Sequence, residues 1–121
     1  MRAESLTLSL PCDIRSGCMA RNDELVVDVR FGTVPRALQP FPVQVSVTTG
    51  QAVESVAIGF SMRGMDMGLN RYRLVASAPH DWRGDITLPI CISGRSDWLA
   101  DVEVTAGGNK YHVAVPFVLE K

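Results

Sequence analysis

The residues best suited to chemistry are three methionines grouped in the middle of the chain. Met62, Met65 and Met67 fall within six residues, and the whole chain of 121 residues has five methionines. A thioether is a soft, neutral ligand that does not titrate, and soft sulfur ligands select Cu(I). Gly64 and Gly68 lie among them and allow the backbone to bend. The group therefore predicts a Cu(I) site on which three sulfurs converge.

The same spacing allows an interpretation without a metal. Methionine also fills irregular gaps in cores and forms adaptable apolar contact surfaces. On a straight strand Met65 and Met67 would share one face, and Met62 would point to the other. The residues alone leave two alternatives open: a Cu(I)-binding domain, or a protein-interaction or structural module that has no metal site.

Two of the three cysteines are close together near the start of the chain. Cys12 and Cys18 lie six positions apart across a turn-like segment. This spacing predicts a disulfide, which the chain-entropy model values at about 2.4 kcal/mol for so short a loop. The alternative is a pair of reduced, buried thiols. Because disulfides persist in oxidising compartments, a bond here predicts a periplasmic or otherwise extracytoplasmic protein.

Cys91 is the remaining cysteine. A thiolate is a strong ligand for Cu(I), so Cys91 is a candidate fourth donor for the methionine site. Ile90 and Ile92 flank it, however, and a cysteine in such a run is also typical of a small buried apolar residue. Both interpretations stay open.

Composition limits the class of protein. A chain of 121 residues with 46% hydrophobic residues predicts one globular domain over residues 1–121. With 12 basic and 13 acidic side chains, the chain lacks the positive field that nucleic-acid binding requires. No run approaches the roughly 18 apolar residues of a membrane span. The first ten residues lack the apolar block of a signal peptide, so we expect that an export signal or anchor has been removed ahead of Met1.

Polar and apolar residues alternate in short runs between turn signals, and no stretch has the period of an amphipathic helix. This pattern predicts an all-β fold, and we expect an immunoglobulin-like antiparallel β-sandwich of about seven to eight strands. Gly107-Gly108-Asn109 predicts a tight hairpin. The expected strands are residues 6–10, 25–31, 43–49, 53–60, 72–77, 86–92, 98–104 and 111–119.

Signatures of catalysis are absent from the sequence. There is no nucleophile elbow, P-loop or His-Glu-x-x-His motif. Cys91 could pair with His80 or His112, but no orienting third group follows at a recognisable spacing. The two histidines also lack the further donors that a zinc site needs. We therefore expect a protein that is not an enzyme.

Several short motifs resemble the periplasmic immunoglobulin-like copper-handling domains of the YtkA and FixH type. The motifs are the segment from Phe60 to Gly68, Leu74, Trp82-Arg83-Gly84, Leu88-Pro89 and the segment from Trp98 to Val102. The resemblance covers about residues 43–104. It implies an extracytoplasmic β-sandwich that carries copper or assists oxidase assembly, with a copper-receiving protein or an oxidase subunit as partner. In that case Met62, Met65 and Met67 occupy the candidate metal loop.

The chain departs from these families in two ways. FixH-type proteins carry a membrane anchor, and the sequence contains no such segment. Copper chaperones with paired histidine and methionine motifs have histidines near the loop, and here none is close in sequence. Both departures bear on copper binding more than on the fold.

Overall fold

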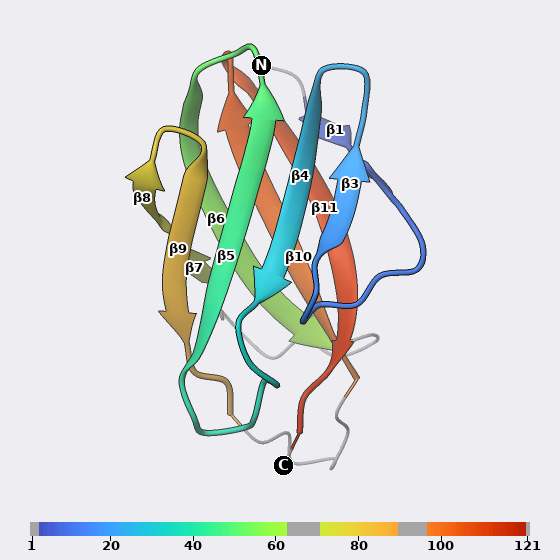
Figure 1. The fold of residues 1–121 in the computed structure, drawn as a ribbon, viewed down its shortest axis with the longest axis vertical. Helices are drawn as coiled ribbons and strands as arrows, with labels where there is room; N and C mark the ends of the chain where they lie inside the picture. Colours follow the sequence, from blue (N-terminus) through green and yellow to red (C-terminus); the bar gives the residue numbers. More distant parts are fainter. Residues whose placement is uncertain (1–2, 63–70, 90–96, 121) are drawn as a thin grey trace.

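The computed structural model describes residues 3–62, 71–89 and 97–120, which form two stacked β-sheets (Figure 1). One sheet has five strands in the order β1-β11-β10-β6-β7, and the other has six in the order β2-β3-β4-β5-β9-β8. None of the described residues forms a helix of the length and hydrophobicity that crossing a bilayer requires. The strands of the first sheet are β1 (Ala3–Ser5), β6 (Val53–Met62), β7 (Arg71–Arg73), β10 (Asp97–Ala106) and β11 (Asn109–Val118). Those of the second are β2 (Thr7–Leu8), β3 (Cys18–Arg21), β4 (Leu25–Phe31), β5 (Phe41–Thr49), β8 (Val75–Ala78) and β9 (Asp81–Ile86).

Strict alternation of side chains builds the core between the sheets. Every second residue of β4 and β5 is buried, and the same holds over most of β6 and throughout β10. Successive side chains on a strand point to opposite faces, so this pattern places one apolar face of each sheet against the other. No charged or polar side chain of the described residues is fully buried. The all-β sandwich predicted from the sequence is confirmed.

The sandwich has two ends, which differ in their residues. The lower end in Figure 1 is called the Met62 end. At this end β4, β6, β9 and β11 finish, and β5 and β10 begin. What we call the Tyr111 end is opposite, where β10 turns into β11 through Gly107 and Gly108. Both glycines have positive φ, 57° and 79°, as a two-residue hairpin turn demands.

An aromatic cluster fills the core near the Met62 end. Phe31 lies 5.1 Å from Phe41 and 5.2 Å from Phe117 between ring centroids, so the rings join β4 and β5 to β11. Phe60 of β6 makes edge-on contacts with Phe41, Phe117 and Tyr72 at 6.0–6.4 Å. Such edge-to-face pairs stabilise a core beyond the burial of their area. The cluster ties both sheets together just inside this end.

Three expected strands are partly wrong, and two of them have different bounds in the structure. The first was expected over residues 6–10, but only Thr7–Leu8 forms a strand there, and Leu10 is 82% exposed. The sixth was expected over residues 86–92, whereas β9 occupies Asp81–Ile86 and residues 87–89 are not in a strand. Residues 90–92 lie outside the described residues.

The position of β9 has a physical reason. Trp82 and Ile86 face the core, Gly84 packs under Leu74, and the charged residues between them face solvent. The residues around Trp82 were not expected to form a strand, and several of them are charged. Those charges belong to the outer face of a half-buried strand, which leaves the inner face apolar.

The chain changes sheets where one long strand was expected over residues 72–77. β7 pairs with β6 in the first sheet, whereas β8 pairs with β9 in the second. Leu74 stands between them and is 2% exposed. Its buried side chain anchors the crossing.

The sandwich is not purely antiparallel, because β1 runs parallel to β11.

The predicted disulfide is present. Cys12 and Cys18 are bonded, and their Cα atoms are 4.7 Å apart. The loop that they close packs on β4, because the amide of Phe31 donates to the carbonyl of Ile14 at 2.8 Å and Ile14 is 9% exposed. The disulfide therefore ties this loop to Cys18, the first residue of β3.

Candidate functional site

Met62 is the described member of the methionine group, and it lies at the end of β6. Ile58, Phe60 and Met62 alternate toward the core, so the position of Met62 follows from the period of the strand. Its register partner on β10 is Trp98. Met62 is 2% exposed and Trp98 is 1% exposed. The thioether is therefore on the core face, beside an indole.

Met65, Met67 and Cys91 lie outside the described residues. Among the described residues, Met62 is the last of β6 and Asp97 is the first of β10, and these two strands are neighbours in the five-stranded sheet.

The surroundings of Met62 favour a soft, uncharged ligand environment. The aromatic cluster lies inward of it, and the indole nitrogen of Trp98 is buried without a hydrogen-bond partner among the described residues. In the same part of the chain, no three or more His, Cys, Asp or Glu side chains are grouped so that they could hold a metal.

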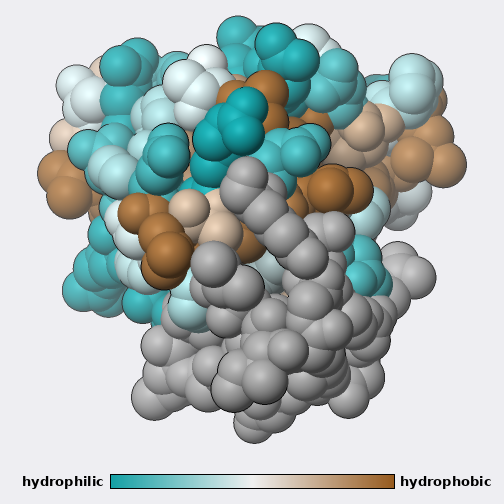
Figure 2. All heavy atoms as spheres, turned by 90° about the horizontal axis from the view of Figure 1, so that it is seen from below, coloured by the Kyte–Doolittle hydropathy of each residue, from teal (hydrophilic) through white to brown (hydrophobic). Residues whose placement is uncertain are grey.

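A hollow opens beside Trp98 at the same end. It has a volume of about 350 Å³ and is lined by Asp97, Trp98, Pro116, Phe117 and Val118. Figure 2 views the molecule from this end, where hydrophobic groups interrupt a mostly hydrophilic described surface. Val118 is 59% exposed there.

Neither histidine lies near Met62. The carbonyl of His80 accepts from Val47 near the Tyr111 end. His112 is on the outer face of β11, where its ring nitrogen is 3.4 Å from the hydroxyl of Ser5.

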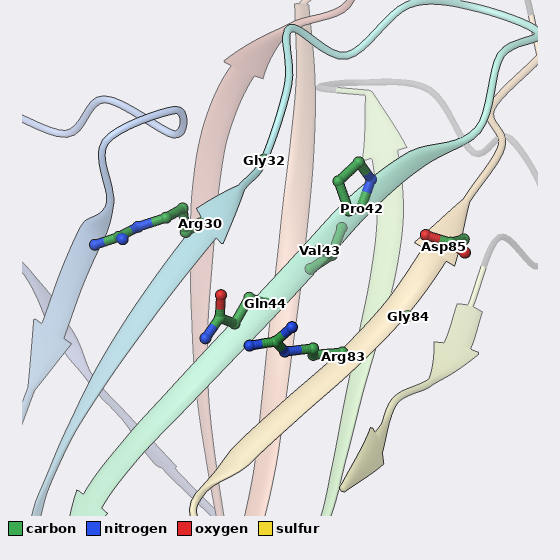
Figure 3. Close-up of a pocket in the computed structure, with 8 residues that line it drawn as sticks. All are labelled: Arg30, Gly32, Pro42, Val43, Gln44, Arg83, Gly84 and Asp85. Atoms are coloured by element: carbon green, nitrogen blue, oxygen red, sulfur yellow. The ribbon is translucent and has the colours of Figure 1, made fainter. Parts of the chain in front are cut away.

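Sequence reasoning missed a hollow of about 370 Å³ on the outer face of the six-stranded sheet. Arg30, Gln44 and Arg83 form one row across β4, β5 and β9. Figure 3 shows that Arg83 reaches toward Gln44, whereas Arg30 points away from both. Each arginine pairs with an acid of its own strand, Arg30 with Asp28 at 3.4 Å and Arg83 with Asp81 at 3.5 Å. The two arginines therefore do not converge on one point where both could bind the same anion.

Asp81 is held in its charged form. The side-chain amide of Gln44 donates to it at 2.9 Å and the hydroxyl of Ser46 at 3.2 Å. These bonds, the Gln44 bond foremost, outweigh desolvation and lower the pKa of Asp81 below its ordinary value. In the sequence, the only indication of these hydrogen bonds is the alternation of polar residues on β5 and β9.

A second hollow that sequence reasoning missed is on the outer face of the five-stranded sheet. It measures about 500 Å³ and is lined by Ser55, Ala57, Arg71, Arg73, Glu103, Thr105 and Lys110. Nearby, burial raises the pKa of Asp101 above its ordinary value. Such hollows depend on which strands are neighbours, and pairing between distant strands cannot be read from local pattern.

No protein-family model and no curated protein matches this chain.

Proposed function

We propose that this chain is an extracytoplasmic domain that binds Cu(I) through Met62, Met65 and Met67 and acts as a copper carrier or an oxidase-assembly factor. The observation that carries the proposal is the position of Met62: its thioether lies beside Trp98 at the end of β6, and Met65 and Met67 follow it closely in the sequence. Cys91 is a candidate further donor, because a thiolate is a strong ligand for Cu(I). A copper-receiving protein or an oxidase subunit is the expected partner.

Three considerations support the proposal. Thioether sulfur keeps its affinity for Cu(I) where thiols are oxidised, and the Cys12–Cys18 disulfide fits an oxidising compartment. The aromatic and apolar neighbours of Met62 disfavour hard, hydrated cations, which need oxygen ligands. The resemblance to YtkA- and FixH-type domains points to the same chemistry.

Titration with Cu(I) tests the site. Under anaerobic conditions wild-type protein should remove Cu(I) from a chromophoric competitor, and a triple Met62→Leu, Met65→Leu, Met67→Leu variant should not. Leucine conserves the volume of methionine, and such exchanges usually cost less than about 1.5 kcal/mol, so the variant should fold. Met19→Leu is the matched control, because Met19 is half exposed on β3 of the other sheet. Equal competition by the wild-type and triple-variant proteins would refute the proposal.

Trp98 offers a second readout of the same titration. Its indole lies beside Met62, so Cu(I) bound there should quench its fluorescence at one equivalent. Trp82 is on β9 of the other sheet, and a Trp82→Phe variant leaves Trp98 as the single reporter. Stoichiometric quenching that persists in the triple methionine variant would place the metal elsewhere.

A second candidate function is a protein-interaction or structural module without a metal. The burial of Met62 at 2% exposure favours it, since methionine at such a position is typical of core packing. The two functions differ in thermal unfolding. A ligand that binds only the folded state raises the melting temperature, by an amount that grows with its concentration, whereas the metal-free module should show no such rise.

A further inference from the structure

The outer face of the five-stranded sheet has a trough along β6. From Ser55 to Gly59, β6 presents only short residues toward solvent, Ser55, Ala57 and Gly59, and no described residue lies within 4 Å of the position where Gly59 would carry a Cβ. Longer side chains stand on both sides, from β7 and from β10. The trough therefore exists because long residues flank a floor of short ones.

The register fixes which residues face each other across the trough. Arg73 lies opposite Ala57 on β7, and Glu103 lies opposite Ala57 on β10. Arg71 and Asp101 likewise flank Gly59. The guanidinium of Arg71 reaches Glu103 at 3.0 Å. The β7 side is therefore cationic.

Positive charge exceeds negative charge among the described residues that line this trough. A single carboxylate oxygen of Glu103 serves both Arg71, at 3.0 Å, and Lys110, at 3.6 Å. Arg73 forms no ion pair with any described residue. Even when Asp101 is counted together with Glu103, three cationic side chains face only two carboxylates. The described lining of the hollow on the other sheet has no such excess, because Arg30 and Arg83 each have an acid of their own and Asp85 lines that hollow as well.

The cations come from strands on both sides of the trough. Arg73 on β7 and Lys110 on β11 are separated by β6 and β10, and strands lie about 4.7–4.9 Å apart, so their backbones are about 14 Å apart. An extended peptide has side chains on one face about 7 Å apart, so several carboxylates of one segment can meet these cations together.

We propose that the trough binds an acidic, extended segment of a partner protein. Its carboxylates pair with Arg73 and compete with Glu103 for Arg71 and Lys110, while its backbone lies over the short residues of β6. This inference uses different residues from the metal proposal, and it stands or falls separately from Cu(I) binding.

The test is a titration of isotope-labelled, metal-free protein with a hexaglutamate peptide, followed by NMR. Shifts should be confined to β6, β7, the facing part of β10 and the residues around Lys110 on β11. Raising the salt from about 10 mM to about 1 M shortens the screening length from about 30 Å to about 3 Å and should abolish them. Hexalysine should leave these signals unchanged.

Variants separate this site from general attraction. Arg73→Gln should weaken binding about fivefold, the scale of one exposed ion pair. Glu103→Gln should tighten binding, because it removes the competing carboxylate. Ala57→Leu fills the floor without changing charge and should also weaken binding. Arg83→Gln, the matched control on the other sheet, should have no effect.

Four results would overturn the inference. One is the absence of saturable shifts with hexaglutamate. Another is equal weakening by Arg73→Gln and Arg83→Gln. A third is undiminished binding by Ala57→Leu. The last is saturation by inorganic phosphate at the same residues with the same affinity, which would identify a small-anion site instead.

Discussion

Tyr111 of β11 donates a hydrogen bond from its phenol to the carboxylate of Glu24, which is in the turn between β3 and β4. The two residues belong to different sheets, so this bond connects the sheets at the end opposite Met62. Tyr111 is fully buried up to its hydroxyl, and Gln51 donates to that same oxygen at 3.5 Å. The turn that holds Glu24 is itself fixed, because the side chain of Asn22 accepts from two backbone amides.

The first prediction concerns this connection. Tyr111→Phe removes the hydroxyl and keeps the ring, and we expect it to lower the free energy of unfolding by about 1–2 kcal/mol. Hydrogen bonds to charged groups contribute about 1.5–3 kcal/mol, and the exposure of Glu24 reduces that value. Urea unfolding measures the change. Tyr72→Phe is the control: its hydroxyl donates to an exposed carbonyl at 3.0 Å, so its loss should be smaller.

The second prediction concerns the disulfide. Replacing Cys12 and Cys18 with serine should lower the free energy of unfolding by about 2 kcal/mol, because the unfolded chain regains the entropy that a six-residue closure removes. Chemical unfolding in a Cys91→Ser background avoids exchange with the third thiol. An unchanged unfolding midpoint would mean that the loop is fixed by Ile14 alone.

The third prediction compares the two glycines of the β10–β11 turn. Gly107→Ala should destabilise the protein by more than about 1 kcal/mol, since φ is 57° and an added Cβ would meet the side-chain oxygen of Gln51. Gly108→Asn should cost much less, because nothing lies within 4 Å of the added Cβ and asparagine tolerates positive φ. Thermal unfolding of both variants gives the comparison. Equal losses would contradict the steric argument.

Alternation in the sequence predicted the long central strands well. The strand expected over residues 25–31 has those bounds, and those expected over 53–60 and 98–104 are extended by a few residues. These strands bury one face each, so their period is strong. The orientation of Met62 toward the core could also have been deduced, because it continues the series of Ile58 and Phe60.

Other features depend on contacts between distant residues. The short strand Cys18–Arg21 was not among the expected strands, since four residues give too little pattern to recognise. The crossing at Leu74 follows from two different partners, β6 and β9, on its two sides. The trough along β6 likewise exists only because β7 and β10 are its neighbours. None of these pairings is encoded in local periodicity.

The last prediction concerns pH and two aspartates whose pKa values are shifted in opposite directions. The Gln44 and Ser46 hydrogen bonds lower the pKa of Asp81, so this group stabilises the folded state above the unfolded pKa of about 3.9. That contribution is lost as the pH falls through the lower folded value. Asp81→Asn should therefore reduce stability at pH 7 and have little effect at pH 2.

Asp101 should respond in the opposite sense. Burial raises its pKa, so the folded state binds its proton more readily than the unfolded state, and stability from this group is lost as the pH rises through the folded value. Asp101→Asn should then increase the free energy of unfolding at pH 7 and give no gain near pH 3. Urea unfolding of both variants at several pH values measures the difference. Because one site is on each sheet and no partner is shared, the double variant should show the sum of the two effects at each pH.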